Sequence, residues 1–219
     1  MALTNSTDRY GGITKTFHWL TALLILAVIP LGIVAHQLPY DTAEQLAQKA
    51  WLFSLHKTVG VTIFFVAIAR IAWACTQRKP TPVADQVPVL EFLANLAHWT
   101  LYASLILVPL TGWIHHSATT GFAPIWWPFG QSLPFVPKDN TVADRFATLH
   151  IFFERVLVIS LLLHIAGALK HHVVDKDATL RRMWFGTTRA AGSTPQASTL
   201  LPPLAALGIF TAVGAAAAL

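Results

Sequence analysis

The sequence has few charged residues. Asp, Glu, Lys and Arg make up 11% of its 219 residues, whereas 54% are hydrophobic, and the mean hydropathy is +0.55. This composition supplies too little polar surface to cover a soluble globule of this size. Basic residues exceed acidic ones by five, but no stretch interleaves them with aromatic residues as a nucleic-acid-binding patch does. We therefore expect a membrane protein that binds no nucleic acid.

Cysteine is almost absent. Cys75 is the single cysteine, so no disulfide can form within the chain, and without a C-x-x-C-H motif the usual covalent attachment of a c-type haem is excluded. The first apolar run also has no small-residue cleavage site before Gln37 and Pro39. We therefore interpret that run as a retained span and not as a signal peptide.

Long apolar runs are what the sequence does have. They cover about residues 16–36, 52–75, 92–114 and 147–172, each near the roughly 20 residues that a helix needs to cross the hydrocarbon core. The predicted fold is an all-α membrane protein, a four-helix transmembrane bundle over residues 1–185. A small polar linker follows at 186–199, and the Ala- and Gly-rich stretch 200–219 is a candidate fifth transmembrane helix that has no closing polar flank.

The basic residues predict the orientation of these spans. Ten of the fifteen Lys and Arg residues flank the four spans on the side of the amino terminus, and four lie on the other side. Because cytoplasmic loops are enriched in Lys and Arg, the amino terminus is expected in the cytoplasm. We call that side inner and the opposite side outer.

Two connections between the spans carry further information. Residues 37–51 contain a helix-compatible stretch that predicts a short surface helix. Residues 117–146 contain four prolines and two glycines, which exclude a continuous helix. This second connection is rich in Phe and Trp, so it is expected either to lie at the membrane interface as part of an aromatic belt or to form a lid over an outer cofactor.

Four of the ten histidines lie within spans at two matching depths. His18 and His164 fall toward the inner surface, whereas His56 and His150 fall toward the outer one. Intramembrane ionisable residues are costly and are functional candidates by default. In a bundle, His18 can face His164 and His56 can face His150, and each pair can supply the two axial ligands of one b-type haem.

Spacing alone leaves other ligands open. His98 also lies at inner depth, and His171 follows His164 by seven residues on the same helical stripe, although it lies about 10 Å further along the axis. The remaining histidines near span ends are expected to be solvated at the outer surface; they are His36, His115 and His116.

Several short motifs, in this order and spacing, resemble the bacterial cytochrome b561 family, the small four-helix di-haem proteins that include superoxide oxidase. They are FHWL at 17–20, LHKTVG at 55–60, LAHWTLY at 96–102, PLTGW at 109–113, LHIFFE at 149–154, LHIAGALKHH at 163–172 and DKDATLRRM at 175–183. The resemblance covers about residues 9–185. It implies that His18 and His164 bind the cytoplasmic haem and that His56 and His150 bind the periplasmic one.

The resemblance also implies an activity. Iron with imidazole on both faces has no open position, so such a centre moves electrons and does not activate a ligand. A superoxide oxidase-like protein takes electrons from superoxide, or from another periplasmic donor, and reduces ubiquinone in the bacterial inner membrane. The alternative is a non-catalytic haem b subunit that serves a partner dehydrogenase or a larger respiratory assembly. A haem-free transporter or scaffold conflicts with the four depth-matched histidines.

Charged residues outside the histidine pairs give finer hypotheses. Lys57, Lys138 and Arg145 on the outer side can attract an anionic donor, or they are ordinary solvated residues. Arg155, inside the last span, can pair with a propionate of the outer haem or with its neighbour Glu154.

At the inner end of the last span, His171 and His172 precede Arg181 and Arg182. These four residues predict a site that bonds a quinone carbonyl or a haem propionate. Alternatively, they are juxtamembrane cations that face anionic lipid.

Overall fold

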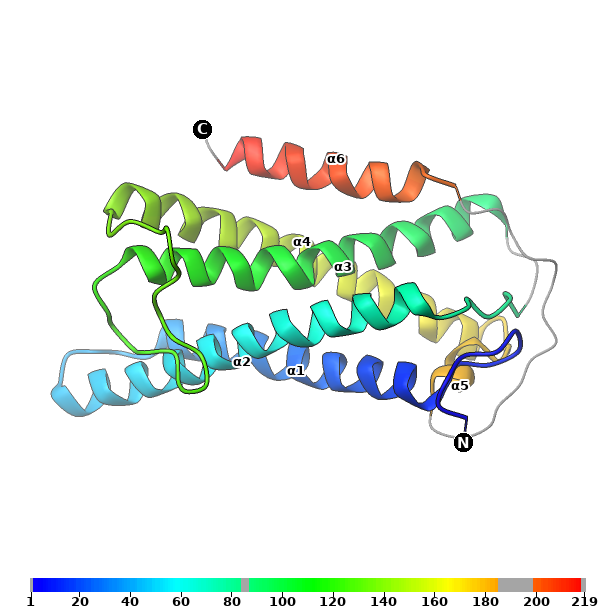
Figure 1. Ribbon diagram of the computed structural model, residues 1–219, viewed down its shortest axis with the longest axis horizontal. Coiled ribbons are helices and arrows are strands. Elements are labelled where there is room, and N and C mark those ends of the chain that lie inside the picture. The colour runs from blue at the N-terminus through cyan, green and yellow to red at the C-terminus, as the bar shows by residue number, and fades with distance from the viewer. Residues whose placement is uncertain (1, 84–86, 185–198, 218–219) are drawn as a thin grey trace.

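The computed structural model describes residues 2–83, 87–184 and 199–217 (Figure 1). All regular structure in these residues is helical. The helices are α1 (Gly12–Gln37), α2 (Ala43–Thr76), α3 (Pro88–Ala118), α4 (Asn140–Val173), α5 (Thr179–Met183) and α6 (Leu201–Ala216).

The four long helices lie side by side and alternate in direction (Figure 1). Helix α3 packs closely on α4, α1 packs on α2, and α2 joins the two pairs through α3, whereas the backbones of α1 and α4 stay further apart. We call the end that carries the amino terminus and α5 the N-terminal end. The opposite end, where residues 119–139 connect α3 to α4, is called the loop end.

Helices α1 to α4 are each long and apolar enough to cross a membrane. Large aliphatic side chains point outward, for example Leu23 and Leu162, which are 64% and 61% exposed. An outer surface of this kind suits lipid and not water. The predicted all-α four-helix transmembrane bundle is confirmed.

The helices begin earlier than the apolar runs indicated. Thr42 accepts a hydrogen bond from the Gln45 amide, and the Gln45 side chain reaches back to the Thr42 amide, which is a complete capping box. The residues predicted as a separate surface helix are therefore the first turns of α2. Asp139 caps α4 in a similar way by accepting a hydrogen bond from the Val142 amide.

Helix α6 packs against α3 and α4, where Phe210 joins a buried cluster with Val108, Phe153 and Leu157. Its 16 residues correspond to a length of about 24 Å, a little short of the roughly 30 Å hydrocarbon core. A fifth transmembrane helix over 200–219 stays a prediction, as do the domain bounds at 185 and 186. All but the last residue of the predicted linker 186–199 lie outside the described residues.

Candidate functional site

The structure brings the four intramembrane histidines together in the two predicted pairs. The ring centroids of His18 on α1 and His164 on α4 lie 6.2 Å apart. Those of His56 on α2 and His150 on α4 lie 6.4 Å apart. The first pair lies at the N-terminal end and the second at the loop end, so each pair bridges the interior between helices that are not neighbours in sequence.

Both rings at the loop end are held by backbone carbonyls of the adjacent helix. Nδ1 of His56 is 2.9 Å from the Val28 carbonyl oxygen, and Nδ1 of His150 is 2.8 Å from the Val108 carbonyl oxygen. A ring that donates Nδ1–H to a carbonyl keeps Nε2 as its acceptor nitrogen, which is the arrangement that metal-binding histidines commonly adopt.

Two glycines allow these rings to approach so closely. A Cβ added at Gly32 would lie 2.7 Å from Cε1 of His56, and one added at Gly112 would lie 2.9 Å from Nδ1 of His150. Each glycine lies four residues after the valine whose carbonyl holds the ring. The sequence signal for these two positions is a glycine shortly after Pro30 or Pro109 inside an apolar run.

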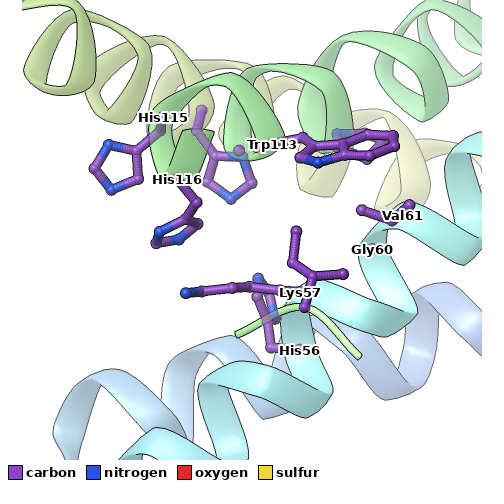
Figure 2. A pocket seen from close by; sticks show the side chains of 11 residues that line it. His56, Lys57, Gly60, Val61, Trp113, His115 and His116 are labelled. Carbon is purple, nitrogen blue, oxygen red and sulfur yellow. The ribbon is translucent and has the colours of Figure 1, made fainter. Parts of the chain in front are cut away.

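A pocket opens beside the loop-end pair (Figure 2). It is lined by residues of α2, α3, α4 and the loop; these are His56, Lys57, Gly60, Val61, Pro109, Gly112, Trp113, His115, His116, Ile125 and His150. Figure 2 shows the Lys57 side chain and the His116 ring extending into the same opening. Basic and aromatic groups therefore surround this pocket.

The loop over the pocket is fastened to the bundle. The Lys57 ammonium donates to the carbonyl oxygens of Phe122 and Ala123 at 2.8 and 2.6 Å, and the Trp126 amide donates to the Thr58 hydroxyl at 3.0 Å. Lys57 is only 6% exposed. The interpretation of Lys57 as a solvated loop lysine was wrong, because the chain folds back over it and supplies carbonyl acceptors.

Of the three outer-side histidines that were predicted to be solvated, one is exposed and two are not. His36 is exposed, as predicted. His115 and His116 are half-buried, and Nδ1 of His115 is 2.7 Å from the Ala143 carbonyl oxygen. Their prediction as solvated histidines was wrong, because α4 and the loop cover the end of α3.

Lys138 donates to the carbonyl oxygens of Ser117 and Thr119, both at 2.7 Å, so it closes the end of α3. Arg145 is exposed. Arg155 is also exposed and lies over the Phe152 ring at 5.4 Å. Arg155 follows His150 by five residues and so lies about 140° around α4 from it. The suggested pairing of Arg155 with a haem propionate does not suit this position.

A third imidazole lies beside the pair at the N-terminal end. The His98 ring is 5.0 Å from the His164 ring in an edge-on contact, and its Nδ1 is 2.6 Å from the Ala94 carbonyl oxygen of its own helix. Within the described part of the chain, no backbone carbonyl orients His18 or His164 in the way seen at the loop end.

The two histidines at the inner end of α4 and the two arginines of α5 do not form one cluster. Nδ1 of His171 is 2.7 Å from Oδ2 of Asp177 and 3.3 Å from Oδ2 of Asp175, whereas His172 is exposed. Arg181 is exposed, but Arg182 is buried at 3% exposure and donates from Nη1 to the Thr81 carbonyl oxygen. Sequence position alone did not distinguish these two arginines.

Comparison with known proteins agrees with this arrangement. Residues 9–186 match the model of the family described as prokaryotic cytochrome b561. The chain is 30% identical over 185 residues to "Cytochrome b561 homolog 2" of Escherichia coli, covering 84% of this chain and 95% of that protein. It is 27% identical over 176 residues to "Probable superoxide oxidase CybB" of Yersinia pestis, covering 80% and 95%. The chain therefore belongs to the prokaryotic cytochrome b561 family, whose members bind haem b and transfer electrons across membranes.

Proposed function

We propose that this protein binds two haems b, one between His18 and His164 and one between His56 and His150, and carries electrons between superoxide and ubiquinone. The supporting observation is the spacing of the rings. With metal–nitrogen bonds of about 2.0 Å and a nitrogen about 1.15 Å from the ring centre, two imidazoles on opposite sides of one iron have centres about 6.3 Å apart. The observed centroid distances are 6.2 and 6.4 Å.

The same test separates the proposed ligands from the alternatives. His98 lies 5.0 Å from His164, too close for an iron between nitrogens on opposite faces. His171 is engaged with Asp175 and Asp177. His18 and His164 therefore fit the N-terminal-end haem better than either alternative.

The residues then have defined tasks. The haem, when bound, supplies a one-electron redox centre, and histidine on both faces leaves no position for dioxygen on the iron. At the loop end, the Val28 and Val108 carbonyls hold the His56 and His150 rings in place. The four histidines are half-buried between the helices, and iron with a histidine on each face favours electron transfer over ligand chemistry.

Superoxide is proposed as the donor at the loop end. Two superoxide anions give two electrons to one ubiquinone, which takes up two protons, so two dioxygen molecules and one ubiquinol leave. The pocket carries the Lys57 ammonium beside the rings of His115 and His116 (Figure 2), and the positive charge of the ammonium attracts an anion. The naming of a relative as a probable superoxide oxidase supports this choice.

Ubiquinone is proposed to be reduced near His171 and His172 at the N-terminal end. Ubiquinone reduction needs hydrogen-bond donors and protons, and a histidine of unperturbed pKa near 6.5 supplies both. The Asp177 carboxylate 2.7 Å from the His171 ring can accept a hydrogen bond from that ring and hold it in place. With the positive-inside orientation in the bacterial inner membrane, these protons come from the cytoplasm.

The proposal is tested by stopped-flow mixing of purified, quinone-loaded protein with superoxide. Rapid reduction and then reoxidation of the haem absorption bands, with formation of ubiquinol, is the expected result. A protein that reacts only with a purified partner dehydrogenase and not with superoxide would instead be an electron-transfer subunit of a larger assembly.

A further inference from the structure

Arg182 on α5 is a buried cation with two N–H donor nitrogens that have no acceptor among the described residues. It is 3% exposed, its Nη1 donates to the Thr81 carbonyl oxygen at 2.8 Å, and its guanidinium lies over the Tyr10 ring at 5.7 Å. Nε and Nη2 are also buried, yet neither has a hydrogen-bond acceptor among the described residues. Buried polar groups are nearly always hydrogen-bonded, so two unpaired donors on one charged group call for an explanation.

The position of Arg182 is fixed by contacts on either side of it. Trp19 on α1 donates from Nε1 to the Met183 carbonyl oxygen at 2.9 Å, and the Trp19 and Trp184 rings meet edge to face at 4.9 Å. Lys15 donates to the Trp184 carbonyl oxygen at 2.8 Å. These bonds dock the segment after α4 against the start of α1 (Figure 1), so the burial of Arg182 is enforced by its neighbours.

Helix α5, which carries these unpaired donors, lies at the same end of the bundle as the His18–His164 pair (Figure 1). Trp19, which holds the residue after Arg182, also contacts the His18 ring at a centroid distance of 5.3 Å. Burial raises the pKa of Tyr10, and the nearby Arg182 partly opposes that rise. The tyrosine is therefore held neutral beside Arg182 and is not a counter-ion for it.

The two free nitrogens also specify the chemistry of the partner. Nε and Nη2 form one edge of the planar guanidinium, and this edge matches a group that offers two oxygen atoms in one plane. Both Arg9 Nε and this edge are buried without an acceptor in the described part of the chain, and Arg9 directly precedes Tyr10. The region therefore suits a carboxylate.

We propose that the Nε and Nη2 edge of Arg182 binds a propionate carboxylate of the haem held by His18 and His164. This inference rests on the proposed function, since it requires a haem at the N-terminal end. The guanidinium then has acceptors for all the donors considered above, and the propionate has a buried counter-charge. Arg182 is a cofactor-binding residue that anchors this haem at its edge while the histidines hold the iron.

The test measures how fast the N-terminal-end haem leaves the purified full-length protein for an excess of apomyoglobin. Arg182→Gln is expected to speed the loss of this haem about tenfold. Arg182→Lys keeps the charge but not the two-nitrogen edge, so its loss is expected to be several-fold faster than in the unmodified protein. Arg181→Gln, which changes the exposed neighbour, is the matched control and should leave the rate unchanged.

A second arm identifies the anion. The apoprotein and its Arg182→Gln variant are reconstituted with haem whose two propionates are methyl esters. Because the ester carries no carboxylate, the two proteins should now lose it at equal rates. A persistent difference would mean that Arg182 serves another anion, such as a lipid phosphate, and would overturn the proposal, as would equal rates for Arg182→Gln and Arg181→Gln with ordinary haem. Failure of the proposed function gives a different result. The unmodified protein would then not contain two haems per chain, or its His18→Ala variant would not lose one of them.

Discussion

The two ends of the bundle present their histidine pairs in different ways. At the loop end, backbone carbonyls orient both rings, two glycines make room for them, and a fastened loop covers the pocket. At the N-terminal end, His18 and His164 lie beside a third imidazole, His98. A short docked helix at the same end carries a buried arginine, Arg182.

The difference shows two ways of preparing a cofactor site in one fold. The loop end relies on the backbone and on shape, which fix the ligands before anything binds. The N-terminal end relies on side chains and charge, which suit the anionic edge of a cofactor and proton exchange. The same four-helix frame therefore provides a sterically defined site at one end and an electrostatically defined site at the other.

Removing one histidine is the largest expected perturbation. His56→Ala or His150→Ala should remove the loop-end haem and leave the other, whereas His18→Ala or His164→Ala should do the reverse, because each iron loses one of its two protein bonds. A pyridine haemochrome assay should fall from two haems per chain to one. Loss of the same haem in both sets, distinguished by redox titration, would contradict the pairing.

Adding one methyl group at a docking glycine should affect the loop end alone. Gly32→Ala and Gly112→Ala each place a carbon within 3 Å of a histidine ring, and overpacking of this kind costs about 1–3 kcal/mol. We expect haem affinity at the loop end to fall about tenfold or more, measured by transfer to apomyoglobin. Gly167→Ala is the control, since an added Cβ there meets nothing within 4 Å.

Loosening the loop should have a smaller effect that spares both haem ligand pairs. Lys57→Met keeps the buried stem but removes two hydrogen bonds to carbonyls, which is worth about 2 kcal/mol. Amide hydrogen exchange within residues 119–139 should become about thirtyfold faster at this free-energy cost. Lys79→Met, at an exposed position, should leave exchange in the loop unchanged, and equal exchange in the two variants would disprove the fastening role.

The smallest expected effect concerns pH at the N-terminal end. Burial opposes ionisation of Asp177, but hydrogen bonds from Thr179 and His171 outweigh it and lower the pKa of this carboxyl group below its ordinary value. Because the folded-state pKa is lowered, this stabilisation is complete above the unfolded-state pKa, near 3.9, and is lost as the pH falls through the folded-state pKa.

Asp177→Asn should therefore reduce stability at pH 7, by less than about 1 kcal/mol because the site is partly open to solvent. The difference from the unmodified protein should shrink below about pH 4 in thermal unfolding. Asp144→Asn, at an exposed position near the loop end, is the control. A difference that stays constant with pH would show that hydrogen-bond geometry, and not ionisation, is responsible.

The sequence predicted the bundle well because hydropathy and helix length are local properties. Histidine depth followed from span direction, which was enough to propose the two pairs now seen to face each other. The start of α2 was also readable from Thr42 and Gln45, whose capping pattern precedes the apolar run. The apolar run alone predicts a later start, because it leaves out the polar first turns of α2.

Features that depend on distant segments were not predictable. Lys57 is buried by a loop more than sixty residues away. Arg182 is buried because the segment after α4 docks on Trp19 and Lys15 near the start of the chain. Arg181, which directly precedes Arg182, is exposed, so composition could not distinguish the buried arginine from the exposed one.

Helix α6 makes the two flanks of the bundle different, because it packs on α3 and α4. It covers part of the α3–α4 flank, where the Phe210 ring lies 5.4 Å from the Phe153 ring. The α1–α2 flank carries no such cover among the described residues. Among the described residues, a hydrophobic carrier or a neighbouring subunit therefore meets α1 and α2 directly on one flank, but meets α6 first on part of the α3–α4 flank.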